Sequence, residues 1–207
     1  MGLRHCHDFE DFRRLARRRL PRPIFDYIDG GADDEATLRH NTASFESCDL
    51  VPNVLRAYTG HPAKFRTFTA FYNLLMLDEE TTQLSKLERE MIAVVVSSAN
   101  RCYYCLVAHG AAVRQLSGDP ELGEMMALNY RVAKLEARQR AMLDYAWKMT
   151  TTPYLVGDDD RDVLRAAGLS AEDVFDLSET VAFFNLSNRM ASATDMMPNK
   201  EYHTAAR

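Results

Sequence analysis

The fold is decided by residues 84–98, which read LSKLEREMIAVVVSS. Within this stretch Met91–Val96 is apolar at every position, a pattern shared by buried strands and buried helices. Ser85 precedes Glu88 by three residues, which is the spacing of a capping box at a helix start, and the chain offers no second strand that could pair with the apolar run. We therefore predict a buried helix from about residue 86 to 98.

The rest of the chain also has helical periodicity, because its apolar residues recur at spacings of three and four. Several positions carry residues that typically begin or end a helix, among them Asp119-Pro120, Gly168, and Ser170 with Asp173. The sequence predicts an all-α bundle with further helices at about 62–76, 103–117, 119–129, 136–150, 159–167 and 171–193.

Composition narrows the class of protein. The 207 residues, 46% hydrophobic and 27% charged, fit one globular domain with room for a short additional arm. The formal net charge of -5 predicts no general attraction to nucleic acid or anionic lipid. The longest apolar run, Met91–Val96, is far shorter than the roughly 20 residues of a membrane span, and no apolar signal-peptide stretch opens the chain. We expect a cytoplasmic protein that binds neither membranes nor nucleic acid.

Residues 1–50 differ from the remainder, since all their basic residues are arginines and the first lysine of the chain is Lys64. Phe9, Phe12 and Leu20 would share one face of a short helix whose other face carries arginines, which we interpret as a solvated face. We predict an N-terminal helical arm over 1–50, packed peripherally or mobile, and a main all-α domain over 51–207.

The chemistry-bearing motif is Cys102-Tyr103-Tyr104-Cys105, followed by His109. On a helix Cys105 and His109 share a face and Cys102 lies one turn earlier, so the three side chains can meet, and the two cysteines are close enough for a reversible disulfide. A break at Asn100-Arg101 is expected to place both cysteines in the first turn of the next helix, where unpaired N–H groups favour a thiolate. Peroxide would oxidise one thiolate to a sulfenic acid, which the second thiol would condense to a disulfide.

Glu90 is the remaining candidate. It stands where a charged sequence becomes wholly apolar, and a facing helix could bring its carboxylate to His109 or to a thiol. A surface glutamate paired with Arg89 or Lys86 is an equally good interpretation from spacing alone.

Other interpretations of the cysteine motif stay open. Cys102, Cys105 and His109 could hold a structural zinc, although no second motif supplies a fourth ligand, or the thiols could simply pack in the core of a helical oligomer. We expect no metal and no cofactor. Tyr103 and Tyr104 are interpreted as packing residues. In the last helix we expect Phe183, Phe184 and Leu186 in the core and a structural or oligomer-contact role for Asn185, Asn188 and Arg189.

From about Val51 onward the sequence resembles a known family. The matching stretches are Leu84–Ser97, Asn100, Cys102–Cys105, His109-Gly110, Gly118–Pro120, and Phe184-Asn185 with Asn188-Arg189. They are similar to the peroxidase-related branch of the alkylhydroperoxidase D and carboxymuconolactone decarboxylase superfamily. The resemblance implies an alkylhydroperoxidase D-like helical bundle that forms homo-oligomers and an antioxidant oxidoreductase that reduces hydroperoxides with electrons from a dithiol protein or small thiol.

The resemblance also implies roles for individual residues. Cys105 would form the sulfenic acid, Cys102 would donate a proton and resolve the intermediate, and Glu90 and His109 would complete a proton relay. Alkylhydroperoxidase D carries a second histidine immediately before the second cysteine, where this chain has Tyr104. Members that decarboxylate a lactone lack the paired cysteines, so that activity is not expected here.

Residues 9–55 resemble a different family. The matching stretches are Phe9–Phe12, Pro23–Tyr27, Gly30–Glu35 and Cys48–Leu55. They are similar to the N-terminus of FMN-dependent α-hydroxy-acid dehydrogenases such as L-lactate dehydrogenase. Those enzymes hold flavin and the catalytic histidine in a (β/α)8 barrel of about 250 residues, for which this chain has neither the strands nor the length. We therefore expect a fusion near Val51–Leu55 without the dehydrogenase activity.

Overall fold

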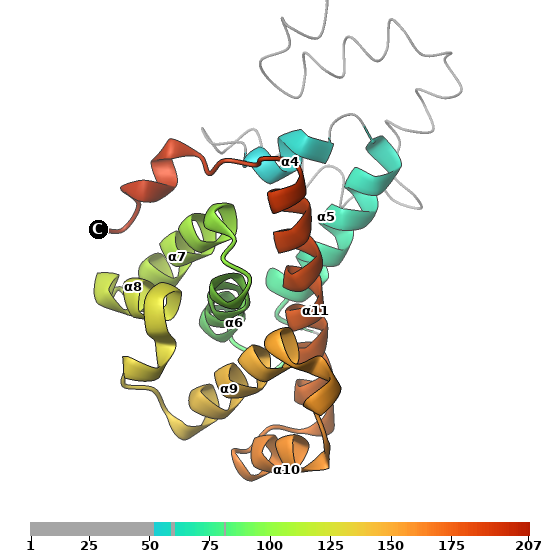
Figure 1. Ribbon diagram of the computed structural model, residues 1–207, viewed down its shortest axis with the longest axis vertical. Helices are drawn as coiled ribbons and strands as arrows, with labels where there is room; N and C mark the ends of the chain where they lie inside the picture. The colour runs from blue at the N-terminus through green and yellow to red at the C-terminus, as the bar shows by residue number, and fades with distance from the viewer. Residues whose placement is uncertain (1–51, 59–60, 81) are drawn as a thin grey trace, which may run out of the picture. The chain divides into compact units, whose positions relative to one another are not determined.

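The computed structural model describes residues 52–58, 61–80 and 82–207, and the predicted arm over 1–50 lies outside these ranges. Within them the chain forms helices and no strand, which confirms the all-α prediction (Figure 1). The α-helices are α4 (Asn53–Tyr58), α5 (Pro62–Met76), α6 (Lys86–Ala99), α7 (Tyr103–Ser117), α8 (Pro120–Asn129), α9 (Ala137–Thr151), α10 (Asp158–Ala166) and α11 (Ala171–Ala193).

Short elements complete the fold. Three single 3₁₀ turns are η2 (Tyr130–Val132), η3 (Pro153–Leu155) and η4 (Lys200–His203). Neither these turns nor α4 was predicted, because segments of three to six residues are too short to show helical periodicity. Among the helices described, none combines the length and the apolar character that a membrane crossing demands.

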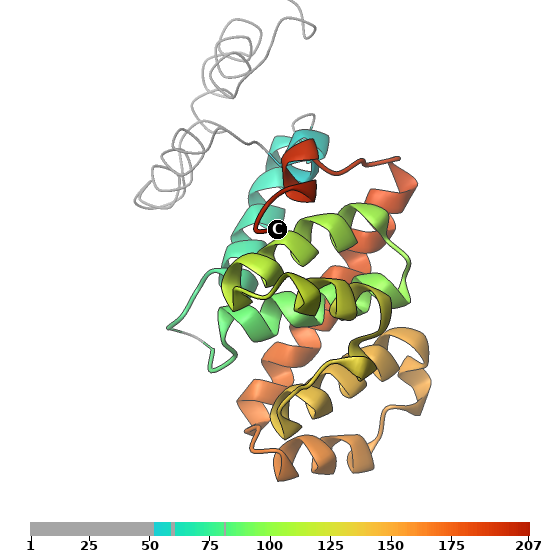
Figure 2. The ribbon, with the colours of Figure 1, turned by 90° about the vertical axis from the view of Figure 1, so that its left-hand side faces the viewer.

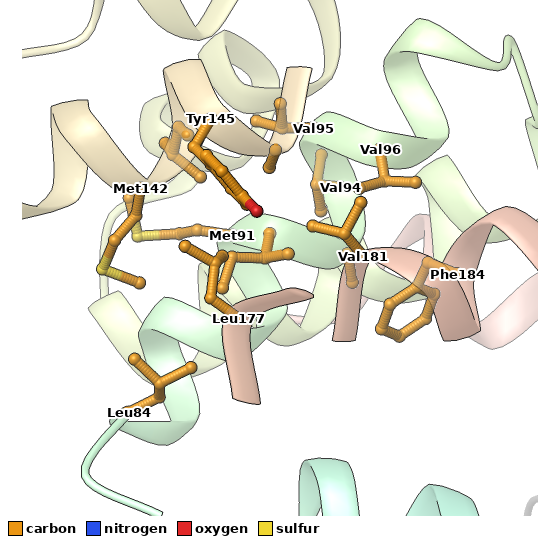
Figure 3. Packing of buried hydrophobic residues seen from close by; sticks show 14 of the residues in the cluster. Leu84, Met91, Val94, Val95, Val96, Met142, Tyr145, Leu177, Val181 and Phe184 are labelled. Carbon is orange, nitrogen blue, oxygen red and sulfur yellow. The ribbon is translucent and has the colours of Figure 1, made fainter. Parts of the chain in front are cut away.

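Helix α6 lies at the centre of the bundle and packs against α7, α8, α9 and α11 (Figures 1 and 2). All six residues of Met91–Val96 are at most 1% exposed. Figure 3 shows the side chains of this run meeting Met142 and Tyr145 from α9 and Leu177, Val181 and Phe184 from α11. A helix that is apolar all round must be enclosed by others, so the uninterrupted run accounts for the central place of α6.

Two charged residues near the start of α6, Glu88 and Arg89, are buried and have hydrogen-bond partners. Ser85 Oγ accepts from the Glu88 N–H at 3.2 Å, and Glu88 Oε2 accepts from the Ser85 N–H at 2.9 Å, which confirms the capping box. Arg138 donates to the same Glu88 carboxylate at 3.1 Å. Arg89 is 1% exposed and donates to the backbone carbonyls of Leu75 and Asp78, so this arginine ties the end of α5 to α6.

Candidate active site

Cys102 lies at the junction of two helices. Helix α6 ends in a Schellman motif: the Cys102 N–H donates to Ser97 O at 2.9 Å, and the N–H of Arg101, which has a left-handed φ of 54°, donates to Ser98 O at 3.1 Å. Cys102 is at the same time the N-cap residue of α7, with extended φ and ψ. The prediction that both cysteines lie in the first turn of α7 is therefore wrong for Cys102 and confirmed for Cys105.

The two thiols, which we call the dithiol, are reduced and buried, with Cys102 2% and Cys105 0% exposed. Interaction with the Cys105 thiol is the main cause that lowers the pKa of Cys102, to about 7. The nearby N–H groups of Cys105 and Tyr104 and the charge of His109 lower it further, against the effect of burial. The interaction with Cys102 and burial raise the pKa of Cys105. Both shifts favour the thiolate on Cys102.

A buried amide supports the second cysteine. Asn188 is 1% exposed, its Oδ1 accepts from Asn100 at 2.9 Å, and its Nδ2 donates to Ser97 Oγ at 3.0 Å. An amide nitrogen has two hydrogens, and Asn188 also interacts with the Cys105 thiol, as does Ser187. Asn188 thus connects α11 both to the turn before α7 and to the dithiol, a contact that the sequence analysis did not predict.

His109 and Glu90 form a close pair between α7 and α6. The His109 Nδ1 and Glu90 Oε2 atoms are 2.6 Å apart, with side-chain exposures of 12% and 11%. The Phe184 ring meets the imidazole edge-on, with centroids 4.7 Å apart, and fixes its orientation. With Nδ1–H directed at the carboxylate, Nε2 of a neutral imidazole is left as a proton acceptor.

The structure brings the four predicted site residues near one another: Cys102 and Cys105 share one buried cluster, the His109 and Glu90 side chains pair at 2.6 Å, and His109 is near enough to lower the pKa of Cys102. The alternative pairing of Glu90 with Arg89 or Lys86 is not observed, because Arg89 donates to backbone carbonyls and Lys86 pairs with Glu79.

Tyr104 stands where the family carries a histidine. Its side chain is buried, burial raises the pKa of its phenol, and its hydroxyl accepts the Val54 N–H at 3.1 Å. Tyr104 therefore ties α7 to α4, as a packing role predicts. Tyr103, by contrast, is 52% exposed, and its ring lies beside that of His203, with centroids 6.3 Å apart.

One predicted core residue of α11 is exposed, and one neighbour of the site, on α5, was not predicted. Phe183 and Phe184 are in the core as predicted, but Leu186 is 53% exposed, so its predicted core position is wrong. Tyr72 on α5 was missed as a neighbour of the site: burial and the Glu90 carboxylate raise the pKa of its phenol. No periodic or spacing signal marks it.

In the described part of the chain, no three His, Cys, Asp or Glu side chains are grouped so as to hold a metal ion.

Comparison with known proteins shows the family to which this fold belongs. The model of the carboxymuconolactone decarboxylase family matches residues 62–142. A peroxidase-related protein from Silicibacter sp. TM1040 is 56% identical, with a TM-score of 0.78 over 86% of this chain and 92% of that one. A peroxidase-related protein with an alkylhydroperoxidase AhpD core, from Ralstonia eutropha JMP134, is 39% identical, with a TM-score of 0.74 over 91% of each chain.

The helical bundle is thus that of the alkylhydroperoxidase AhpD-like proteins. This chain belongs to their family, in its peroxidase-related branch, within the carboxymuconolactone decarboxylase superfamily. The debrominase Bmp8 shares the fold at 16% identity, with a TM-score of 0.68 over 86% of this chain and 93% of that one.

The N-terminal part matches a different group. The model of the FMN-dependent dehydrogenases matches residues 16–77. L-lactate dehydrogenase from Caulobacter sp. (strain K31) is 52% identical over 46 residues, and (S)-mandelate dehydrogenase from Pseudomonas putida is 41% identical over 46 residues. Each match covers 22% of this chain and 12% of the relative, so the chain spans only a small part of these dehydrogenases.

Proposed function

We propose that this protein is a thiol-dependent peroxidase that reduces hydroperoxides through the dithiol, with His109 and Glu90 as its proton relay. The observation that carries the proposal is that Cys102 and Cys105 share one buried cluster, while the His109 and Glu90 side chains pair at 2.6 Å. Interaction with Cys105 lowers the pKa of Cys102, which favours the reactive thiolate. Membership of the AhpD-like family supports a peroxidase-related, antioxidant function in general.

In the first step the Cys102 thiolate attacks the terminal peroxide oxygen and the O–O bond breaks. Cys102 becomes a sulfenic acid, and the leaving alkoxide takes a proton from protonated His109 to give the alcohol. Glu90 accepts the Nδ1–H of His109 at 2.6 Å and so stabilises the imidazolium before this transfer.

In the second step the Cys105 thiol attacks the Cys102 sulfenic acid, giving a disulfide and water. A dithiol protein or small thiol then supplies two electrons and two protons and restores both thiols. This order gives the first attack to Cys102, whereas the family resemblance implies Cys105. The raised pKa and complete burial of Cys105 favour it as the hydrogen-bond donor and resolving thiol.

The test uses a full-length variant with Cys6→Ser and Cys48→Ser, so that only the dithiol is counted. One equivalent of peroxide is expected to remove both remaining thiols and to lower the intact mass by two hydrogen atoms. In the same background, Cys105→Ser is expected to give a trappable sulfenic acid on Cys102, and Cys102→Ser is not. Persistence of both thiols in peroxide would exclude the proposed activity.

We also propose that the enzyme works in the cytoplasm as a homo-oligomer, where cellular thiols supply its reductant. Sedimentation analysis of the full chain tests the oligomer, and a monomer at micromolar concentration would contradict it.

A further inference from the structure

Two side chains from distant parts of the sequence lie against the dithiol cluster. Val54 comes from α4 and Met196 from the segment after α11, and both pack on the cluster that contains Cys102 and Cys105. Figures 1 and 2 show α4 beside this C-terminal segment. We call Val54 and Met196 the cover. Because both cysteines are almost fully buried beneath their neighbours, a peroxide reaches sulfur only by displacing side chains of this kind.

The position of Met196 is set by the end of α11. Asp195 has a left-handed φ of 49°, and the Met196 N–H donates to Ala191 O at 3.0 Å, which is the long bond of a Schellman motif. This motif brings the residue after the turn against the last turn of the helix, and Met196 accordingly packs on the cluster that includes Ala191. Its backbone is therefore fixed, while its unbranched side chain remains adaptable.

Hydrogen bonds join the other half of the cover to the same segment. The Asn53 N–H donates to Asn199 Oδ1 at 2.9 Å, and Asn53 Nδ2 donates to Met197 O at 2.8 Å. The next residue, Val54, donates its N–H to Tyr104, which stands between the two cysteines. The backbone on both sides of the dithiol is thus held, and only side chains are free to make room for a substrate.

We propose that Met196 determines which hydroperoxides reach the dithiol, and that the site takes hydrogen peroxide and slender alkyl hydroperoxides in preference to those with a bulky group beside the O–O bond. The inference rests on the proposed peroxidase function. In-line attack requires the peroxide oxygen about 3–3.5 Å from sulfur, so a substituent on that peroxide must displace side chains that pack on this cluster, of which Met196 is one. A slender substrate displaces the flexible thioether, whereas a bulky one meets the held backbone.

The test compares thiol oxidation rates by hydrogen peroxide and by cumene hydroperoxide in the full-length chain. Met196→Ala is expected to raise the ratio of the cumene hydroperoxide rate to the hydrogen peroxide rate by about tenfold or more. This is the size of the discrimination that a few methylene groups usually provide in an apolar pocket. Met196→Leu, which keeps the volume, and Met197→Ala, which trims an exposed neighbour, are expected to leave the ratio near that of the parent. An unchanged ratio in Met196→Ala would overturn the inference.

A second readout does not depend on peroxide chemistry. Iodoacetamide and the bulkier N-phenylmaleimide both alkylate thiolates, and Met196→Ala is expected to favour the maleimide in the same way. If neither peroxide oxidised the dithiol, the proposed peroxidase function would be rejected. The alkylation ratio would still show whether Met196 limits access to the dithiol. An alkylation ratio equal to that of the parent would reject that role.

Discussion

Replacing Cys105 by alanine tests the charge distribution of the dithiol. The pKa of Cys102 stands at about 7 instead of 9.0, and the first cause of this shift is the Cys105 S–H. Without that donor we expect the pKa of Cys102 to rise by at least about one unit, since the charged form loses its main hydrogen bond. The thiolate fraction at pH 7 would then fall from about one half to about one tenth or less, and alkylation of Cys102 would slow about fivefold.

The assay is the pH dependence of Cys102 alkylation by iodoacetamide, followed by mass spectrometry in the background with Cys6→Ser and Cys48→Ser. Because the thiolate is the reacting form, the rate rises with pH through the pKa of Cys102, near 7 in the parent and near 8 or above in Cys105→Ala. Cys105→Ser is the matched control, since its hydroxyl keeps a donor and its midpoint should stay close to that of the parent.

Two results would refute this reasoning. Equal midpoints for Cys105→Ala and Cys105→Ser would mean that the donor does not hold the charge on Cys102. Faster alkylation of Cys105 than of Cys102 in the parent would mean that the thiolate lies on the other sulfur, as the family resemblance implies.

The remaining predictions concern stability, measured by urea unfolding. In Gly123→Ala the new Cβ would lie 2.7 Å from Arg114 Cγ and 3.0 Å from a backbone oxygen, so we expect a loss of about 1–3 kcal/mol. In Gly110→Ala the nearest contact of the new Cβ is an ordinary 3.7 Å, so the higher helix propensity of alanine should stabilise the protein by about 0.5–1 kcal/mol. If both variants changed the free energy of unfolding in the same direction, the packing argument would be contradicted. Ser85→Ala removes the capping box and should cost about 1 kcal/mol, whereas Ser85→Thr should cost less. Asn188→Ala removes two buried hydrogen bonds and should cost about 1–3 kcal/mol, and no measurable loss would argue against the amide network.

The bundle could be predicted because its signals are local. The run Met91–Val96 is apolar on every side, and the capping box precedes it. The helical conformation of α6, its first residue and its burial can therefore be predicted from neighbouring residues in the sequence. The other long helices also agree with their predicted ranges to within about two residues. Leu186 was misplaced because an apolar residue next to two core phenylalanines gives no local sign of the face on which it lies.

The pairing of Glu90 could not be predicted, because its partner comes from another helix. Spacing in the sequence gave the carboxylate equal chances of facing solvent or the site. The choice depends on how far α7 is displaced along α6, and that displacement is set by the turn at Asn100-Arg101, which folds α7 back so that His109 meets Glu90 at 2.6 Å.

The roles within the dithiol depend on where α7 begins. The predicted start of this helix at residue 103 is confirmed, and it leaves Cys102 just before the first turn, at the N-cap. At the N-cap its sulfur lies near the N–H groups of Tyr104 and Cys105, which lower the pKa of Cys102, and interaction with the Cys105 thiol lowers it most. Both effects favour charge on Cys102. If the Schellman turn before α7 creates this asymmetry, substitutions in that turn should change the pKa of Cys102 without any contact to its sulfur.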